Sequence, residues 1–87
     1  KYSVNADKTI TIEKYTGNSE KPDIPRRIFG KKVQTIGEYA FAGNLNVKTI
    51  NIPDTVKTIG EGAFFNCSNL REIVLPESVV SIGINAF

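Results

Sequence analysis

A 23-residue internal repeat constrains this 87-residue chain more than any other feature of its sequence. The hexapeptide IGEYAF begins at residue 36, and its relatives IGEGAF and IGINAF begin at residues 59 and 82, so the pattern returns after 23 residues each time. The same interval links further apolar or proline positions, namely Val47 with Leu70, Ile50 with Ile73, Ile52 with Leu75, Pro53 with Pro76 and Val56 with Val79. The residues between them vary in charge and size. This pattern predicts a solenoid in which each coil buries its apolar face against its neighbours.

An altered copy precedes these repeats. Ile24 and Pro25 match Ile52 and Pro53, but the following chain is five residues longer, and the extra residues fall within RRIFGKK at 26–32. Further upstream, apolar and polar residues alternate in 2–4 and 10–12 around the turn-forming NADK. This alternation predicts a β-hairpin. We expect the hairpin to cover the first open face of the solenoid core.

Each repeated position has an expected role. Ile73 and Leu75 are two residues apart and therefore share one face of a short strand. Pro76 lacks an N–H group, so the strand is expected to end there. A second short strand is expected at 80–82. The Ala86-Phe87 pair is expected on a helical or 3₁₀ turn, with the ring filling the coil interior.

The combined pattern L-x-x-I-x-L-P-x-x-V-x-x-I-G-x-x-A-F resembles the 23-residue leucine-rich repeats of the BspA-like (Treponema pallidum-type) family. The residues that carry it are Leu70, Ile73, Leu75, Pro76, Val79, Ile82, Gly83, Ala86 and Phe87, with Phe64-x-x-Cys67 before them. The middle repeat departs at two positions, with Val47 in place of leucine and Asn44 in place of cysteine. The resemblance covers nearly the whole chain, including the longer first repeat between Ile24 and Gly37 and the N-terminal hairpin.

The expected fold is therefore β-rich α/β: a right-handed leucine-rich-repeat solenoid of short parallel strands and short helical or 3₁₀ turns, with an N-terminal β-hairpin cap. We expect a single domain at 1–87, with a cap at 1–20, a variant first repeat at 21–43, a repeat at 44–66 and an incomplete repeat at 67–87. The absence of methionine and the open final repeat suggest a piece of a longer protein with further repeats, or self-association through the uncapped C-terminal coil.

The stretch Gly60-Glu61-Gly62 suggests a phosphate-binding loop, but the pattern does not sustain that hypothesis. A dinucleotide-binding fingerprint needs a third small residue three positions after Gly62, and Phe65 stands there. The sibling repeats carry Tyr39 and Asn85 at the position of Gly62. We therefore interpret the glycine shared by all three repeats as a turn residue with positive φ or as a point of close approach between coils, and Gly62 as incidental.

The composition argues against an enzyme or a metal site. The chain contains no histidine, the commonest general base and transition-metal ligand, and its single cysteine, Cys67, has no imidazole to activate it. We expect Cys67 to be a small buried group between coils, where its counterpart Asn44 hydrogen-bonds loop backbone. Nothing in the spacing of the nine carboxylates singles out a catalytic pair. No catalytic, metal-binding or cofactor-binding residue is predicted.

The densest charge cluster is basic and consists of Arg26, Arg27, Lys31 and Lys32. Two readings remain open: a polyanion or glycan site, or a solvated loop whose charges keep an insertion soluble. Ile28 and Phe29, inside this cluster, are expected to tuck the loop against the first coil. The net charge of only +2 does not favour a dedicated nucleic-acid binder.

A second candidate site is the outer face of the predicted sheet. Stacking the coils aligns two rows of outward residues, Lys21/Thr49/Glu72 and Asp23/Asn51/Val74. The rows differ chemically at each step while the buried positions stay uniform, which fits either an interaction face on a repeat scaffold or ordinary solvated positions.

The leading functional hypothesis is a non-enzymatic protein-interaction module, and the alternatives are a structural spacer or stalk and polyanion binding through the basic insertion. The family resemblance implies a secreted or surface-attached bacterial protein whose ligand is a protein of a host or neighbouring cell. No nucleic-acid partner is predicted. Membrane insertion is not expected either, because no apolar run approaches the roughly 20 residues of a membrane span.

Overall fold

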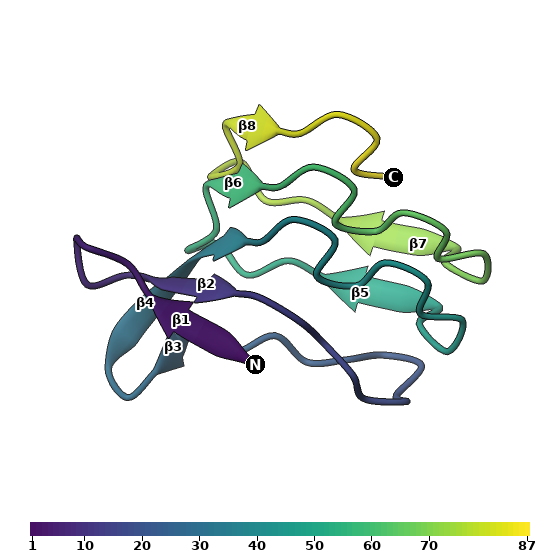
Figure 1. The fold of residues 1–87 in the computed structure, drawn as a ribbon, viewed down its shortest axis with the longest axis horizontal. Coiled ribbons are helices and arrows are strands. Elements are labelled where there is room, and N and C mark those ends of the chain that lie inside the picture. Colours follow the sequence, from purple (N-terminus) through teal and green to yellow (C-terminus); the bar gives the residue numbers. More distant parts are fainter.

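The computed structural model describes residues 1–87 as a flattened solenoid whose extents are 33 × 24 × 19 Å. Each coil runs through one short strand, reverses direction at a proline turn, returns through a second short strand and crosses back through a loop (Figure 1). The eight strands are β1 (Tyr2–Val4), β2 (Ile10–Ile12), β3 (Arg27–Ile28), β4 (Lys31–Ile36), β5 (Thr49–Asn51), β6 (Thr58–Ile59), β7 (Glu72–Val74) and β8 (Ser81–Ile82).

The strands form two sheets whose registers reproduce the 23-residue repeat. In the larger sheet β4, β6 and β8 are parallel, and Ile36, Ile59 and Ile82 are register partners. In the smaller sheet β5 and β7 are parallel, with Ile50 opposite Ile73. The predicted β-rich solenoid of short parallel strands is therefore confirmed.

The N-terminal hairpin forms as expected and extends the larger sheet. Strands β1 and β2 pair antiparallel, and β2 then pairs parallel with β4. Ile10 on β2 is fully buried against the first coil. Beyond the hairpin, the Tyr15 amide donates a 2.8 Å hydrogen bond to the Ala40 carbonyl oxygen, and the Tyr15 ring stacks on Phe41. The N-terminal segment thus covers the core face of the first coil.

A column of stacked aromatic rings runs through the core along the solenoid axis. Successive ring centroids are 5.0 Å apart from Tyr15 to Phe41, 5.0 Å from Phe41 to Phe64 and 5.3 Å from Phe64 to Phe87. This spacing follows from the parallel strand separation of about 4.8 Å, which places equivalent side chains directly above one another. The expectation that the repeated phenylalanine fills the coil interior holds for Phe41 and Phe64, which are both buried, but is wrong for Phe87, which stacks on Phe64 and is 53% exposed.

The prediction of helical or 3₁₀ turns is wrong, because the structure contains no helix of either kind. In the loop after β4, amides donate alternately to two kinds of acceptor. The amides of Tyr39, Phe41 and Gly43 bond the next coil, to the carbonyl oxygens of Glu61, Ala63 and Phe65. The intervening amides of residues 40, 42 and 44 bond carbonyls three residues back. A helix needs consecutive bonds along its own chain, and the bonds between coils take every second donor.

The glycine shared by all repeats marks a close approach between coils rather than a positive φ. A Cβ atom on Gly60 would lie 2.9 Å from both the Glu38 nitrogen and the Gly37 carbonyl carbon. The interpretation of Gly62 as incidental is wrong. Its φ is +60°, and the equivalent Tyr39 and Asn85 also have positive φ, at 54° and 56°. The loop requires a left-handed residue at this position in every coil, and only Gly62 adopts it without a steric penalty.

The five-residue insertion forms a second hairpin, in which β3 pairs antiparallel with β4. Its two loop residues, Phe29 and Gly30, have φ of 50° and 79°, the signs required by a type I′ turn. Ile28 packs on the core as expected, but Phe29 is 88% exposed, so the expectation that it tucks against the first coil is wrong. A side chain at the tip of a two-residue hairpin turn projects beyond the strands that would otherwise cover it.

The opposite end of the solenoid displays apolar side chains, which gather on the last coil. Those of Val80, Ile82, Ile84 and Phe87 are all exposed. Strands β7 and β8 each have a partner strand on one side only (Figure 1).

Candidate functional site

The outer face of the β5–β7 sheet aligns one row of candidate residues as expected. Asp23 forms a parallel bridge with Asn51, and Asn51 is the register partner of Val74. All three residues are exposed. The inward-facing strand residue between the rows is isoleucine in both strands, with Ile50 buried and Ile73 partly buried against the core. A charged, an amide and an apolar side chain therefore stand side by side on an otherwise repetitive scaffold.

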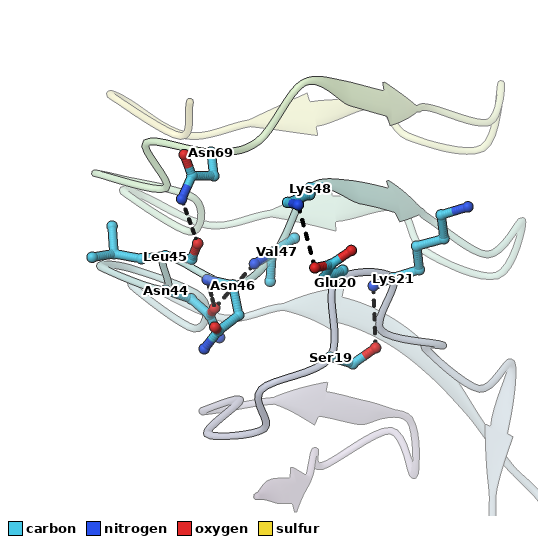
Figure 2. Close-up of polar contacts among 9 residues, drawn as sticks. All are labelled: Ser19, Glu20, Lys21, Asn44, Leu45, Asn46, Val47, Lys48 and Asn69. Carbon is cyan, nitrogen blue, oxygen red and sulfur yellow. Dashed lines mark hydrogen bonds and ion pairs between the residues drawn. The ribbon is translucent and has the colours of Figure 1, made fainter.

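The second row is aligned at the first residues of the two strands. Thr49 is the register partner of Glu72, and the Thr49 amide donates to the Glu20 carbonyl oxygen, which places Lys21 beside Thr49. The Lys21 amide donates a 3.1 Å hydrogen bond to the Ser19 hydroxyl, while its side chain extends away from the neighbouring ion pair (Figure 2). The structure thus brings all six predicted face residues onto one surface.

An ion pair that was not predicted from the sequence borders this face. Lys48 Nζ lies 3.2 Å from Glu20 Oε2, and both side chains are substantially exposed (Figure 2). The register that aligns Lys21 with Thr49 also aligns Glu20 with Lys48, so opposite charges at these two positions were a usable signal. Being exposed, the pair contributes on the order of 0 to 1 kcal/mol to stability. Its main effect is to hold two charged side chains at the edge of the row.

Asparagine side chains fix the loops that lead into the strands (Figure 2). Asn44 Oδ1 accepts hydrogen bonds from the amides of Asn46 and Val47, at 2.9 and 3.2 Å. In the next coil Asn69 Nδ2 donates a 2.7 Å bond back to the Leu45 carbonyl oxygen. Asn44 thus satisfies backbone groups of its own loop, as expected, while Asn69 satisfies a backbone group of the preceding coil.

The four basic residues predicted as one patch do not all share a surface. In the β3–β4 hairpin Arg27 pairs with Lys32, and Ile28 pairs with Lys31. Directly paired residues lie on the same face of a sheet, and Ile28 packs on the core, so the half-buried Lys31 lies on the opposite face from Arg27 and Lys32. Arg26 forms a 2.8 Å ion pair with Asp54.

Cys67 has the environment of a structural thiol. It is buried, and its Sγ lies 3.0 Å from the Phe41 carbonyl oxygen, to which the thiol donates across the coils. Burial raises the pKa of the Cys67 thiol, because the thiolate would lose its hydration. A raised pKa disfavours the nucleophilic form, so the surroundings give no support to a catalytic role.

No group of three potential metal ligands lies together in the structure, and it contains no helix long and apolar enough to cross a membrane.

The repeating register, the proline turns and the stacked core rings define a β-solenoid of the leucine-rich-repeat class. Residues 6–87 match the family model described as a BspA-type leucine-rich repeat region. The chain belongs to this family, which confirms the resemblance drawn from the repeat pattern. No protein with a curated description is significantly similar to it in sequence.

Three solved bacterial structures share the fold. The leucine-rich repeat protein of Treponema pallidum is 30% identical, with a TM-score of 0.91 over 94% of this chain and 39% of its own. A leucine-rich cell surface protein of Faecalibacterium prausnitzii is 38% identical, with a TM-score of 0.91 over 99% of this chain and 25% of its own. A leucine-rich repeat protein of Bacteroides capillosus is 29% identical, with a TM-score of 0.86 over 93% of this chain and 64% of its own. The chain therefore spans between a quarter and just under two thirds of these proteins.

Proposed function

We propose that the chain is a non-enzymatic protein-interaction module that binds through the outer face of the β5–β7 sheet. The observation that carries this proposal is the row Asp23–Asn51–Val74, in which an acid, an amide and an apolar side chain occupy register-matched exposed positions. Repeat scaffolds present binding surfaces in this way, since the backbone is uniform and only the outward residues differ.

The second row, Lys21, Thr49 and Glu72, widens this surface and gives it charges of both signs. Side chains of opposite charge on one face favour a partner with complementary charges and disfavour partners with a single sign. Val74, at 51% exposure, adds apolar area that a protein partner can cover. A mixed surface of this kind suits a folded protein better than a uniformly charged polymer.

We further propose that the parent protein is bacterial and acts at the cell surface or in secreted form, with a protein of a host or neighbouring cell as its ligand. The support for this location is the relative from F. prausnitzii, which is described as a cell surface protein and is 38% identical. Proteins of this repeat family are generally non-catalytic, which is consistent with a binding role.

Site-specific photo-crosslinking tests the proposed surface. A photo-reactive amino acid at Asn51 is compared with the same residue at Glu38, which follows β4 on the returning layer of the coil and is also exposed. With surface-protein extracts of host cells or of neighbouring bacteria, we expect a discrete crosslinked product from position 51 only. The product should be lost when Asp23 and Glu72 are both changed to serine. Equal products from positions 51 and 38, or a product that the double change leaves intact, would contradict the proposal.

A further inference from the structure

A polar hollow of about 440 Å³ lies beside the β3–β4 hairpin and shares no residue with the β5–β7 face. None of its lining side chains is hydrophobic; they are Thr9, Arg26, Arg27, Lys32, Gln34, Asp54, Thr55 and Lys57. We refer to this hollow as the basic groove. Three of the four basic residues singled out in the sequence line this groove. Lys31 does not, and Lys57 from the next coil does.

Strand β4 and the start of the next coil explain how the groove forms. Val33 is fully buried, so its neighbours Lys32 and Gln34 face outward together. The Lys57 amide donates a 2.8 Å hydrogen bond to the Gln34 carbonyl oxygen, which fixes Lys57 beside Gln34. The hairpin then places Arg27 directly opposite Lys32. The repeat register and the insertion together concentrate cations that are far apart in the sequence.

The groove carries positive charge that the protein itself does not neutralise. Asp54 is its only carboxylate, and Arg26 occupies that group at 2.8 Å. No ion pair involves Arg27, Lys32 or Lys57. Outside the groove, the pKa of the Asp7 carboxyl is lowered mainly by hydrogen bonds from Thr9, including one of 2.6 Å from its hydroxyl, and to a smaller extent by the charge of Lys57, with which Asp7 forms no ion pair. Like charges directly opposite one another on paired strands are destabilising, so the Arg27–Lys32 pair reduces the stability of the hairpin unless an anion bridges it.

We propose that the basic groove binds an anionic polysaccharide, with Arg27, Lys32 and Lys57 contacting its sulfate or carboxylate groups. The amide of Gln34 and the hydroxyls of Thr9 and Thr55 can donate to and accept from sugar hydroxyls. The groove has no aromatic lining on which nucleobases would stack and no apolar wall for an acyl chain. This site is additional to the proposed protein-binding face and does not depend on it.

The test compares two triple variants with the same change in charge, measured against fluorescein-labelled heparin oligosaccharide by fluorescence polarisation. One variant is Arg27→Ser, Lys32→Ser and Lys57→Ser. Its control is Lys14→Ser, Lys31→Ser and Arg71→Ser, whose positions are all outside the groove. We expect the groove variant to lose affinity by roughly tenfold or more, because each charge-assisted contact contributes a factor of a few. The control should lose much less. Equal losses in the two variants, or no binding by the wild type at low salt, would overturn the proposal.

Two further measurements complete this test. Thermal unfolding should show that the groove variant is about as stable as the wild type, since it removes the Arg27–Lys32 repulsion together with one exposed hydrogen bond from Arg27 to the Gly30 carbonyl oxygen. Lost binding then cannot be due to misfolding. Competition with hyaluronan, which carries carboxylates only, and with desulfated heparin identifies which anion is recognised. A single-stranded DNA of equal charge that competes as well as heparin would refute recognition of a polysaccharide. A variant with Asp23→Ser and Glu72→Ser should keep full heparin affinity, which separates this site from the proposed protein-binding face.

Discussion

Phe41 and Phe64 occupy the same place in successive coils, and their rings stack with centroids 5.0 Å apart and planes inclined by 22°. Both rings are buried, and they form the centre of the column that begins at Tyr15 and ends at Phe87. The column connects neighbouring coils, whose strands are only two to six residues long. Stability in such a fold depends on contacts between neighbouring repeats, so the phenylalanine positions are central to it.

Replacing Phe64 with alanine is expected to lower the free energy of unfolding by about 3 to 5 kcal/mol, because it leaves a cavity between two rings. Phe65→Ala is the matched control, since Phe65 is an exposed neighbour of the same chemical type. Urea denaturation followed by circular dichroism measures both variants. A loss for Phe65→Ala as large as that for Phe64→Ala would contradict the role assigned to the column.

Gly60→Ala tests the close approach between coils. The added Cβ would lie 2.9 Å from backbone atoms of residues 37 and 38, and backbone cannot move aside as a flexible side chain can. We expect a loss of about 1 to 3 kcal/mol in the free energy of unfolding, typical of an overpacked site. Ser68→Ala, at an exposed position, should change stability little. An unchanged midpoint for Gly60→Ala in urea denaturation would show that the coils can separate without penalty.

Phe29→Asn is expected to stabilise the protein by about 1 kcal/mol. Phe29 has a φ of 50°, which is unfavourable for a bulky residue, and asparagine is favoured at the first position of a type I′ turn. Because Phe29 is 88% exposed, removing its ring sacrifices little buried area. Phe29→Ala provides the control, since it removes the ring but keeps a residue that disfavours positive φ. Differential scanning calorimetry should rank asparagine above both alanine and the wild type, and the reverse ranking would exclude strain at this turn.

Cys67 should make stability depend on pH in the alkaline range. Burial raises the pKa of its thiol, so the folded state holds the proton more tightly than the unfolded chain. The resulting stability is fully present below the ordinary thiol pKa of about 8.5 and is lost as the pH rises above it, because the unfolded thiol then ionises first. The difference in unfolding free energy between the wild type and Cys67→Ala should therefore shrink as the pH rises above about 8.5. A constant difference over this range would contradict the raised pKa.

Much of the fold could be predicted from the repeat alone. The interval that links Ile36, Ile59 and Ile82 in the sequence is the strand register observed between β4, β6 and β8. It also predicted the row Asp23–Asn51–Val74, because outward positions must follow the same register as the buried ones. The buried positions can be read from the sequence because the equivalent residue of each coil packs in the same surroundings, so its apolar character recurs at a fixed interval.

The loops after the strands were harder to predict. Residues 38–43 look suited to a helical turn, but their alternate amides bond the next coil, and this demand is absent from the local sequence. These bonds between coils also come with a positive φ at one loop position. Tyr39 and Asn85 adopt it despite the steric cost, whereas Gly62 adopts it freely. The sequence does not reveal this requirement for a positive φ, because three different residue types, Tyr39, Gly62 and Asn85, occupy the position.

The sequence by itself determined the solenoid, its 23-residue register and the identity of its core, because burial of one apolar face per coil follows directly from the repeat. Only the tertiary structure decided which charges act together. Lys31 and Lys32 are neighbours in the chain but lie on opposite faces of the hairpin, whereas Lys57 joins Lys32 in the groove across 25 positions. Side chains alternate across a strand, and coils stack in register, so nearness in sequence does not determine nearness on the surface.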